Sequence, residues 1–449
     1  KQRVKRHNMI YCNRCLYPSN HPYGMIFDDD GICMGCRIHE EKDVLDWDSR
    51  FKKLEQIAHT NSKIMGTKNF DCIIPVTGGG DSYFIVHVAK NLLGMNPLLV
   101  NYNSHYNTKL GIRNLANLST VFDCDIVTST LSPNHLKKIT KQSIKQYGSM
   151  YWQALAGYTT FPVQTAIRFR IPLIIWGVHP WSEQTGMFSH IDEVEMSHRC
   201  RKEHALMGIS AEDLVHSDSN VSRSDVQPFI YPYDNELEAV GVRGIYLSNY
   251  IRWDSKTQHE LMIEQYGYET SKQQRTFNTY EDVHCFHSAG IHDFIKYLKY
   301  GYSKVTDHAS REIRLKRMTR KTGIEMVKKY SEKEPEDLDL FLKWIGMNKD
   351  DFYLHINKFR DKDAWHFQDN EWKLNDSIIN YLDSDDSFLK NIKDDCNFKI
   401  TESAEPNIED NEYLLMGRGY IDSRDYGAHE DQSPGGGMTN RKWKRPSIK

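Results

Sequence analysis

The sequence predicts an α/β protein with a parallel sheet that helices cover on both faces. Four segments are predicted to be strands, because each is short and largely apolar rather than alternating. They span 70–76, 97–103, 125–130 and 171–177. Segments of helical periodicity separate them, and the first of these, "DSYFIVHVAKNLLG", ends at Gly94. Alternating strands and helices are typical of βαβ units, in which the strands run parallel.

The pattern changes along the chain and predicts four parts. A polar helical connector that contains Trp47 follows a short amino-terminal segment, and beyond about residue 270 the periodicity is almost entirely helical. From about residue 400 the chain is polar and turn-rich, which favours a tail that is disordered or ordered by a partner. We predict a metal module with its connector (1–66), an α/β domain (67–270), a helical region (271–400) and a polar tail (401–449).

Composition limits the classes of function. The 449 residues include 39% hydrophobic residues, enough for a large core, and 58 Lys plus Arg nearly balance 61 Asp plus Glu. No overall positive field is therefore available to attract nucleic acid. Apolar runs such as "IPLIIWG" are too short to span a bilayer, so we expect a cytoplasmic protein.

Four of the nine cysteines lie close together near the amino terminus. Cys12, Cys15, Cys33 and Cys36 form C-x2-C-x17-C-x2-C, which is the spacing of a zinc ribbon or knuckle. Four thiolates saturate a structural Zn²⁺, so we predict a zinc site; two disulfides or free thiols in a core are the alternatives. The other cysteines are predicted to be buried apolar side chains: Cys72, Cys124, Cys200, Cys285 and Cys396.

A glycine loop joins the first predicted strand to the first helix. The segment "TGGGDS" (77–82) directs backbone N–H groups and the positive end of a helix dipole toward one point, which is typical of a phosphate site. It lacks the lysine of a Walker A loop, and Tyr83 replaces the third glycine of a dinucleotide loop. The simpler alternative is a turn in which Asp81 and Ser82 only cap the helix.

This loop resembles the S-G-G-x-D-S loop of the PP-loop ATP pyrophosphatases, with Thr77 in place of the first serine. The resemblance implies that ATP and Mg²⁺ are bound, that Asp81 and Ser82 act in catalysis, and that Asp81 is the magnesium-side carboxylate. Asn101 and Gly177, at the ends of two predicted strands, would flank the nucleotide. The implied pyrophosphate-binding residues are Thr77, Gly78, Gly79, Gly80, Asp81 and Ser82.

A wider resemblance covers about residues 8–365. The four-cysteine segment, the glycine loop, "GIYLSNYIRWD", "TFNTYEDVH" and "GYSKVTDHASREIRLKRMTR" together are similar to the bacterial N-acetyl sugar amidotransferases. That family acts in surface-polysaccharide pathways, including lipopolysaccharide biosynthesis, and converts a sugar acetamido group to an acetamidino group through adenylation. One departure is that residues 150–157 lack the cysteine expected there, which puts a role for a thiol in that segment in doubt.

The segment "TDHASREIR" carries the predicted substrate site. If Asp307 caps or opens a helix, Asp307, Arg311 and Arg314 share one face, and His308 lies beside the cap. Two guanidiniums suit a nucleotide-sugar diphosphate or a sugar carboxylate. An amphipathic helix with an ordinary Asp–Arg surface pair is the alternative.

The source of ammonia is predicted to be another protein. None of the nine cysteines has the sequence context of a glutaminase nucleophile. The resemblance implies a separate glutaminase partner, with or without a channel-forming subunit. A tRNA-modifying PP-loop enzyme, a thiolase or a lysidine-type synthetase, is the rival function; a non-catalytic scaffold is a third. The near-neutral charge and the absence of a second C-x-x-C favour the sugar enzyme.

Overall fold

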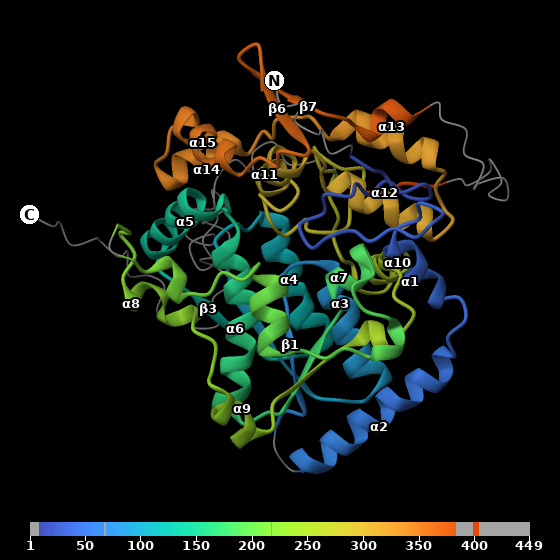
Figure 1. Ribbon diagram of the computed structural model, residues 1–449. Coiled ribbons are helices and arrows are strands. Elements are labelled where there is room, and N and C mark those ends of the chain that lie inside the picture. The colour runs from blue at the N-terminus through green and yellow to red at the C-terminus, as the bar shows by residue number, and fades with distance from the viewer. Residues whose placement is uncertain (1–8, 67–68, 217, 383–397, 404–449) are drawn as a thin grey trace, which may run out of the picture.

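A five-stranded parallel sheet forms the centre of the protein (Figure 1). The computed structural model describes residues 9–66, 69–216, 218–382 and 398–403. The strand order is β3-β2-β1-β4-β5. The strands are β1 (Cys72–Pro75), β2 (Pro97–Asn103), β3 (Ile126–Thr130), β4 (Leu173–Trp176) and β5 (Arg243–Tyr246). This sheet confirms the predicted fold class.

The fifth strand was not predicted. β5 pairs with β4 along its length, from Leu173 opposite Arg243 to Trp176 opposite Tyr246. It is an edge strand of four residues, and its first residue is exposed, so it lacks the long apolar run that marks the inner strands. Pairing with β4 along one edge therefore decides its conformation.

The two faces of the sheet pack against different helices. Ile74, Leu99 and Ile175 belong to one core cluster, with side chains of α3 (Gly80–His87), α4 (Lys109–Phe122) and α10 (Ser255–Tyr266). Ile73 and Ile174 belong to a second cluster, with α5 (Pro133–Tyr147) and α6 (Trp152–Phe169). Neighbours along a strand thus point to opposite faces, as the pleat requires. Burying each isoleucine contributes roughly 1.5–3 kcal/mol.

The predicted helices near the glycine loop are present with small differences. The helix expected to end at Gly94 is α3 followed by a π-helical turn, Val88–Leu92, and Gly94 has a φ of 64°. The connector is α2 (Trp47–Met65), which Asp46 caps by accepting from the Ser49 N–H and which Gly66 ends. Shorter helices connect the larger elements: α1 (Met34–Glu41), α7 (Pro180–Thr185), α8 (Arg223–Val226) and α9 (Asp234–Val240).

The region after residue 270 is mostly helical, as predicted. It comprises α11 (Ile291–Tyr300), α12 (Lys304–Arg314), α13 (Arg320–Tyr330), α14 (Leu338–Ile345) and α15 (Lys349–Ile356). An unpredicted hairpin follows, with β6 (Trp365–Gln368) antiparallel to β7 (Glu371–Leu374). Figure 1 shows these orange elements stacked on one end of the α/β part. The predicted polar tail lies, after residue 403, outside the described residues.

The amino-terminal cysteine segment packs against α12 and α13. The Leu16 N–H donates to Ser310 Oγ at 3.2 Å, and Arg320 Nε donates to the Cys15 carbonyl at 3.3 Å. This contact joins the amino-terminal segment to the helical region at one end of the sheet (Figure 1). Within the described ranges no helix has both the length and the apolar character needed to cross a membrane. The boundaries of the four predicted parts stay predictions.

Candidate functional site

A cavity of about 520 Å³ lies at the carboxyl edge of the sheet. The strand order reverses between β1 and β4, and the segments that leave these two strands supply Gly79 and Val178 to its wall. Open α/β sheets bind ligands at this switch point. The amino-terminal module adds Tyr17, His39 and Lys42 to the wall, and other segments of the α/β part add Tyr151, Tyr158, Glu183, Gln184, Trp253 and His259. The helical region closes the remaining side with Glu281, Asp282, His284, His292, Lys304, Asp307, His308, Arg311 and Arg314.

The glycine loop is held by its own hydroxyl groups. Ser82 Oγ accepts from the Thr77 N–H at 2.9 Å, and Thr77 Oγ1 accepts from the Gly79 N–H at 3.1 Å. Thr77, Gly79, Gly80 and Asp81 line the cavity, so the first turn of α3 faces it. A turn that only caps the helix would not need to line a cavity. The amino terminus of α3 can therefore receive an anion from the cavity.

The loop packs directly on the first turn of α4. A Cβ atom added at Gly78 would lie 2.2 Å from the Gly111 carbonyl oxygen, and one added at Gly111 would lie 2.4 Å from His284 Cα. Three backbone segments therefore stack without side chains between them. Glycine at these positions is needed for close approach rather than for a special φ.

Two buried polar atoms beside this stack have no protein partner. Asn101 Nδ2 donates to the Val76 carbonyl at 2.9 Å, but Asn101 Oδ1 and His284 Nδ1 have no hydrogen bond. Both residues line a small pocket that also borders Thr77 and Gly78. Because buried polar atoms are nearly always satisfied, we expect these two atoms to bond a water molecule or a single polar atom of a ligand.

Asp81 has no close counter-charge. Its nearest ion-pair partner is His259, with 3.6 Å between Nε2 and Oδ1. The Asp81 side chain is 47% exposed, but that surface faces the cavity, where protein still surrounds it. This burial raises the pKa of Asp81 from 3.8 to about 6, although His259 opposes the shift. The residue is therefore placed to meet a cation that neutralises it.

The shift at Asp81 predicts a stability effect. Its folded-state pKa lies above the unfolded value, so its stabilising contribution is complete below pH 3.8 and is lost as the pH rises through about 6. We expect Asp81→Asn to raise the melting temperature at pH 8, with the difference vanishing near pH 4. Scanning calorimetry across this range measures it. Asp125→Asn, at an exposed position, is the control; equal pH profiles for the two variants would contradict the assignment.

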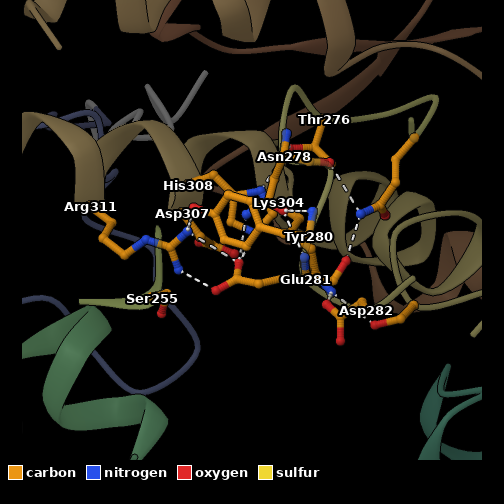
Figure 2. A network of polar contacts seen from close by, with 12 residues as sticks. Ser255, Thr276, Asn278, Tyr280, Glu281, Asp282, Lys304, Asp307, His308 and Arg311 are labelled. Carbon is orange, nitrogen blue, oxygen red and sulfur yellow. Dashed lines mark hydrogen bonds and ion pairs between the residues drawn. The ribbon is translucent and has the colours of Figure 1, made fainter. Parts of the chain in front are cut away.

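Glu281 organises the opposite wall (Figure 2). Arg311 Nη1 donates to Glu281 Oε1 at 2.6 Å, and His308 Nε2 lies 3.0 Å from Glu281 Oε2. His308 Nδ1 lies 2.6 Å from Thr276 Oγ1, and Arg311 Nη2 donates to Tyr280 Oη at 3.2 Å. Burial disfavours the charge, but Arg311 and His308 outweigh it and hold the pKa of Glu281 well below its ordinary value. The two predicted substrate residues are therefore held in fixed positions on the cavity wall.

The sequence prediction assumed that Asp307 caps or opens a helix, but the cap of this helix is Ser303. α12 begins after Ser303, and Asp307 lies on its first turn, paired with Lys296 Nζ at 2.5 Å. Asp307 Oδ1 is buried without a partner. Lys304, at the start of the same helix, pairs with Asp282 at 2.5 Å. The wall thus presents paired charges to the cavity.

Arg314 points to the cysteine cluster. Its Nε lies 3.4 Å from Cys36 Sγ and its Nη2 lies 3.3 Å from Cys33 Sγ, while its Nη1 and Nη2 donate to the Glu183 and Gln184 carbonyls. The thiols and carbonyls therefore hold the donors of the guanidinium that was predicted to bind a substrate together with that of Arg311. A substrate role for Arg314 stays a prediction.

The four amino-terminal cysteines have the geometry of a zinc site. Their Sγ atoms all lie within 4.8 Å of one another, with separations of 3.5 Å for Cys15–Cys33 and 4.0 Å for Cys12–Cys36. Tetrahedral zinc spaces its sulfur ligands by roughly 3.8 Å. All four are free rather than disulfide-bonded. The Cys33 N–H donates to Cys12 Sγ at 3.2 Å, which stabilises a thiolate.

Four predicted residues do not line the cavity: Gly78, Ser82, Asn101 and Gly177. Ser82 is 5% exposed and holds the loop through the bond to Thr77. Gly177 packs against the Trp253 ring, which a Cβ at Gly177 would approach to 3.0 Å, and its neighbour Val178 reaches the cavity instead. Their roles toward the nucleotide stay predictions.

Sequence reasoning missed much of the far wall. Glu281, Asp282 and His284 lie in "TFNTYEDVH", which carried the resemblance but was given no role. Residues 150–157 contain no cysteine, but a thiol from another part of the chain lies beside them. Tyr151 Oη donates to Cys285 Sγ at 3.5 Å. Burial raises the pKa of Cys285 to about 11, so it is a neutral thiol near pH 7.

Comparison with known proteins identifies the domain that forms this wall. Residues 274–378 match the family model described as LPS biosynthesis protein WbpG-like, C-terminal domain. This part of the chain is similar to that family, and we refer to it as the WbpG-like domain. The match supports the resemblance to the PP-loop amidotransferases that the sequence indicates. The WbpG-like domain supplies Glu281, His308 and Arg311 to the cavity.

Two solved structures are similar to parts of the chain. An NH3-dependent NAD synthetase from Campylobacter jejuni is 14% identical over 32% of this chain, with a TM-score of 0.26. An NMN synthetase from Francisella tularensis is 12% identical over 48% of this chain, also with a TM-score of 0.26. The matches span 62% of the first structure and 96% of the second. No curated protein sequence matches the chain.

Proposed function

We propose that this protein is an ATP-dependent amidotransferase that converts the acetamido group of a nucleotide-linked sugar to an acetamidino group for a surface polysaccharide. The observation that carries the proposal is one cavity with two different walls. The glycine loop at the switch point of the sheet forms one wall, and the WbpG-like domain forms the other. A nucleotide and a sugar can therefore meet in one enclosed space.

The glycine-loop wall fits ATP. Backbone groups of Gly79 and Gly80 at the start of α3 would hold the departing pyrophosphate. The unpartnered atoms of Asn101 and His284 would bond the nucleotide. Asp81 would hold Mg²⁺, which neutralises charge that builds on the phosphates. The loop has no lysine, so this neutralisation depends on the metal and on the helix amino terminus.

The opposite wall fits the sugar. Arg311, fixed by Glu281, would bind an anionic group of the sugar nucleotide, and His308 would hold Glu281 in place. The acetamido oxygen would attack the α-phosphorus of ATP and release pyrophosphate, and ammonia would then replace that oxygen as AMP leaves. Burial lowers the pKa of His292 to about 3, so it is neutral near pH 7 and could accept a hydrogen bond from ammonia without taking its proton. The enclosing aromatic side chains of Tyr151 and Tyr158 would exclude water.

Ammonia would come from a separate glutaminase. Of the eight described cysteines, four form the amino-terminal cluster, Cys72, Cys124 and Cys285 are buried, and Cys200 is partly buried; none of the eight lines the cavity. None therefore suits a glutaminase nucleophile. The same absence of an activated thiol disfavours sulfur transfer to tRNA. A glutaminase, with or without a channel subunit, is the proposed partner, and the cytoplasm is the proposed location.

The test is pyrophosphate release from Mg²⁺ and ATP with ammonium, comparing nucleotide-activated acetamido sugars with bulk tRNA. We expect release that depends on one sugar, with equal AMP and a product in which NH replaces oxygen. Asp81→Asn should lower the rate on the order of 100-fold, whereas the exposed His59→Ala should not change it. Release stimulated by tRNA alone would overturn the proposal in favour of RNA modification.

A further inference from the structure

We propose that the protein has a second metal site, formed by His179, Cys200 and His204, that binds Zn²⁺. The ligand atoms of the three side chains all lie within 4.8 Å of one another. None of the three lines the large cavity, and none belongs to the four-cysteine cluster. This His₂Cys site is therefore separate from both sites described above.

The fold brings the three residues together from two segments. His179 follows β4 and immediately precedes α7. Cys200 and His204 lie four residues apart in a π-helical turn, Cys200–Ala205, so one turn presents both toward the same side. Short π-helical turns are frequent at functional sites. Because 20 residues separate His179 from Cys200, no local spacing in the sequence indicates this group.

Unpartnered nitrogen atoms support a ligand between these residues. His179 is 5% exposed, and its Nδ1 and that of His204 are buried without a hydrogen bond. The two imidazole rings lie edge to face, with centroids 5.4 Å apart. A buried polar atom without a partner is unfavourable, and a bound metal ion would satisfy one nitrogen of each ring.

The surroundings hold the ligands in place. Arg201, in the same turn, donates to the Phe229 carbonyl at 3.0 Å and to Thr159 Oγ1 at 3.2 Å. Trp181 Nε1 donates to the carbonyl of His204 at 3.2 Å. Phe188 and Tyr246 place their rings 5.3 Å from that of His179. The site is thus built into a fixed and mainly aromatic environment, which metal sites require of the residues around their ligands.

The ligand set selects the metal. Two imidazoles and one thiolate suit Zn²⁺, and they disfavour Mg²⁺ and Ca²⁺, which prefer oxygen. Three protein ligands leave one position for water, unlike the saturated four-cysteine cluster. His179 immediately precedes α7, which carries Glu183 and Gln184 of the cavity wall. A metal bound to His179 would therefore help to hold α7 in position.

The test is the zinc content of the whole chain, saturated with zinc and freed of excess metal. We expect two equivalents per chain in the parent, one for each cysteine-containing group, and one in Cys200→Ser and in His204→Gln. Both substituted residues are only partly buried, and circular dichroism checks that the variants fold. The exposed His59→Ala should keep both equivalents.

Cobalt provides a second readout that does not depend on activity. After the four-cysteine cluster is filled, a further equivalent of Co²⁺ should add visible d–d absorption with the weaker thiolate band of a single sulfur. His204→Gln should lose this increment. A parent chain that binds one equivalent only, or a second equivalent that persists unchanged in both variants, would overturn the proposal.

Discussion

Replacing Arg275 with methionine is expected to destabilise the protein by about 3–5 kcal/mol. Arg275 and Asp293 are both 0% exposed, with 3.0 Å between Nε and Oδ2. Arg275 Nη2 also donates to the Ser331 carbonyl at 2.8 Å. The substitution would leave the Asp293 carboxylate buried without its counter-charge, although the Lys304 N–H would still donate to its Oδ1. The urea midpoint of unfolding measures the loss.

A surface pair provides the matched control. Arg199 and Glu203 form an ion pair with side chains 82% and 50% exposed. Because water screens it, Arg199→Met should cost about 0–1 kcal/mol. If the two arginine variants unfolded at the same urea concentration, the buried Arg275–Asp293 pair would not stabilise the WbpG-like domain more than the surface pair does.

Gly78→Ala should lower pyrophosphate release on the order of 100-fold, since a displacement of about 1 Å can cost that much. The added Cβ would lie 2.2 Å from the Gly111 carbonyl oxygen and 2.8 Å from its carbon. Gly111 cannot yield, because it is itself packed on the backbone of His284. The glycine loop must therefore move away from the position that receives the phosphates. The rate at saturating ATP with the active sugar measures the effect.

Gly79→Ala tests whether the effect depends on backbone contact. Its Cβ would meet only side-chain atoms, His284 Nδ1 at 3.1 Å and Thr77 Oγ1 at 3.2 Å, which can shift by a few tenths of an ångström. We expect this variant to keep most of the activity. Equal losses in the two variants would contradict the steric explanation, and equal melting temperatures would separate a local effect from unfolding.

The features that were predictable from the sequence are local in the chain. The glycine loop directly follows its strand, and the two cysteine pairs lie within 25 residues of each other. The local sequence was therefore sufficient to identify both features. β5 was missed because its conformation depends on β4, about 70 residues earlier. A strand of four residues with an exposed end has no pattern of its own.

The far wall was not predictable for a different reason. Glu281 is defined by its ion pair with Arg311, which lies 30 residues away on another element. The sequence placed Arg311 and Arg314 on one face, which helix geometry supports, but it could not show that thiols of the amino-terminal module hold Arg314. Pairing of charges over long separations is decided by tertiary packing alone.

The packing of the cysteine segment on α12 and α13 also sets an order of events during synthesis. Leu16 and Ser310 are 294 residues apart, and Cys15 and Arg320 are 305 apart. A ribosome adds about 5–20 residues per second, so the first residues wait roughly 15–60 seconds for these partners. Until then the four amino-terminal cysteines are exposed to solvent, because α12 and α13 have not yet been synthesised. A zinc ion captured in that interval would give the nascent module a folded core of its own.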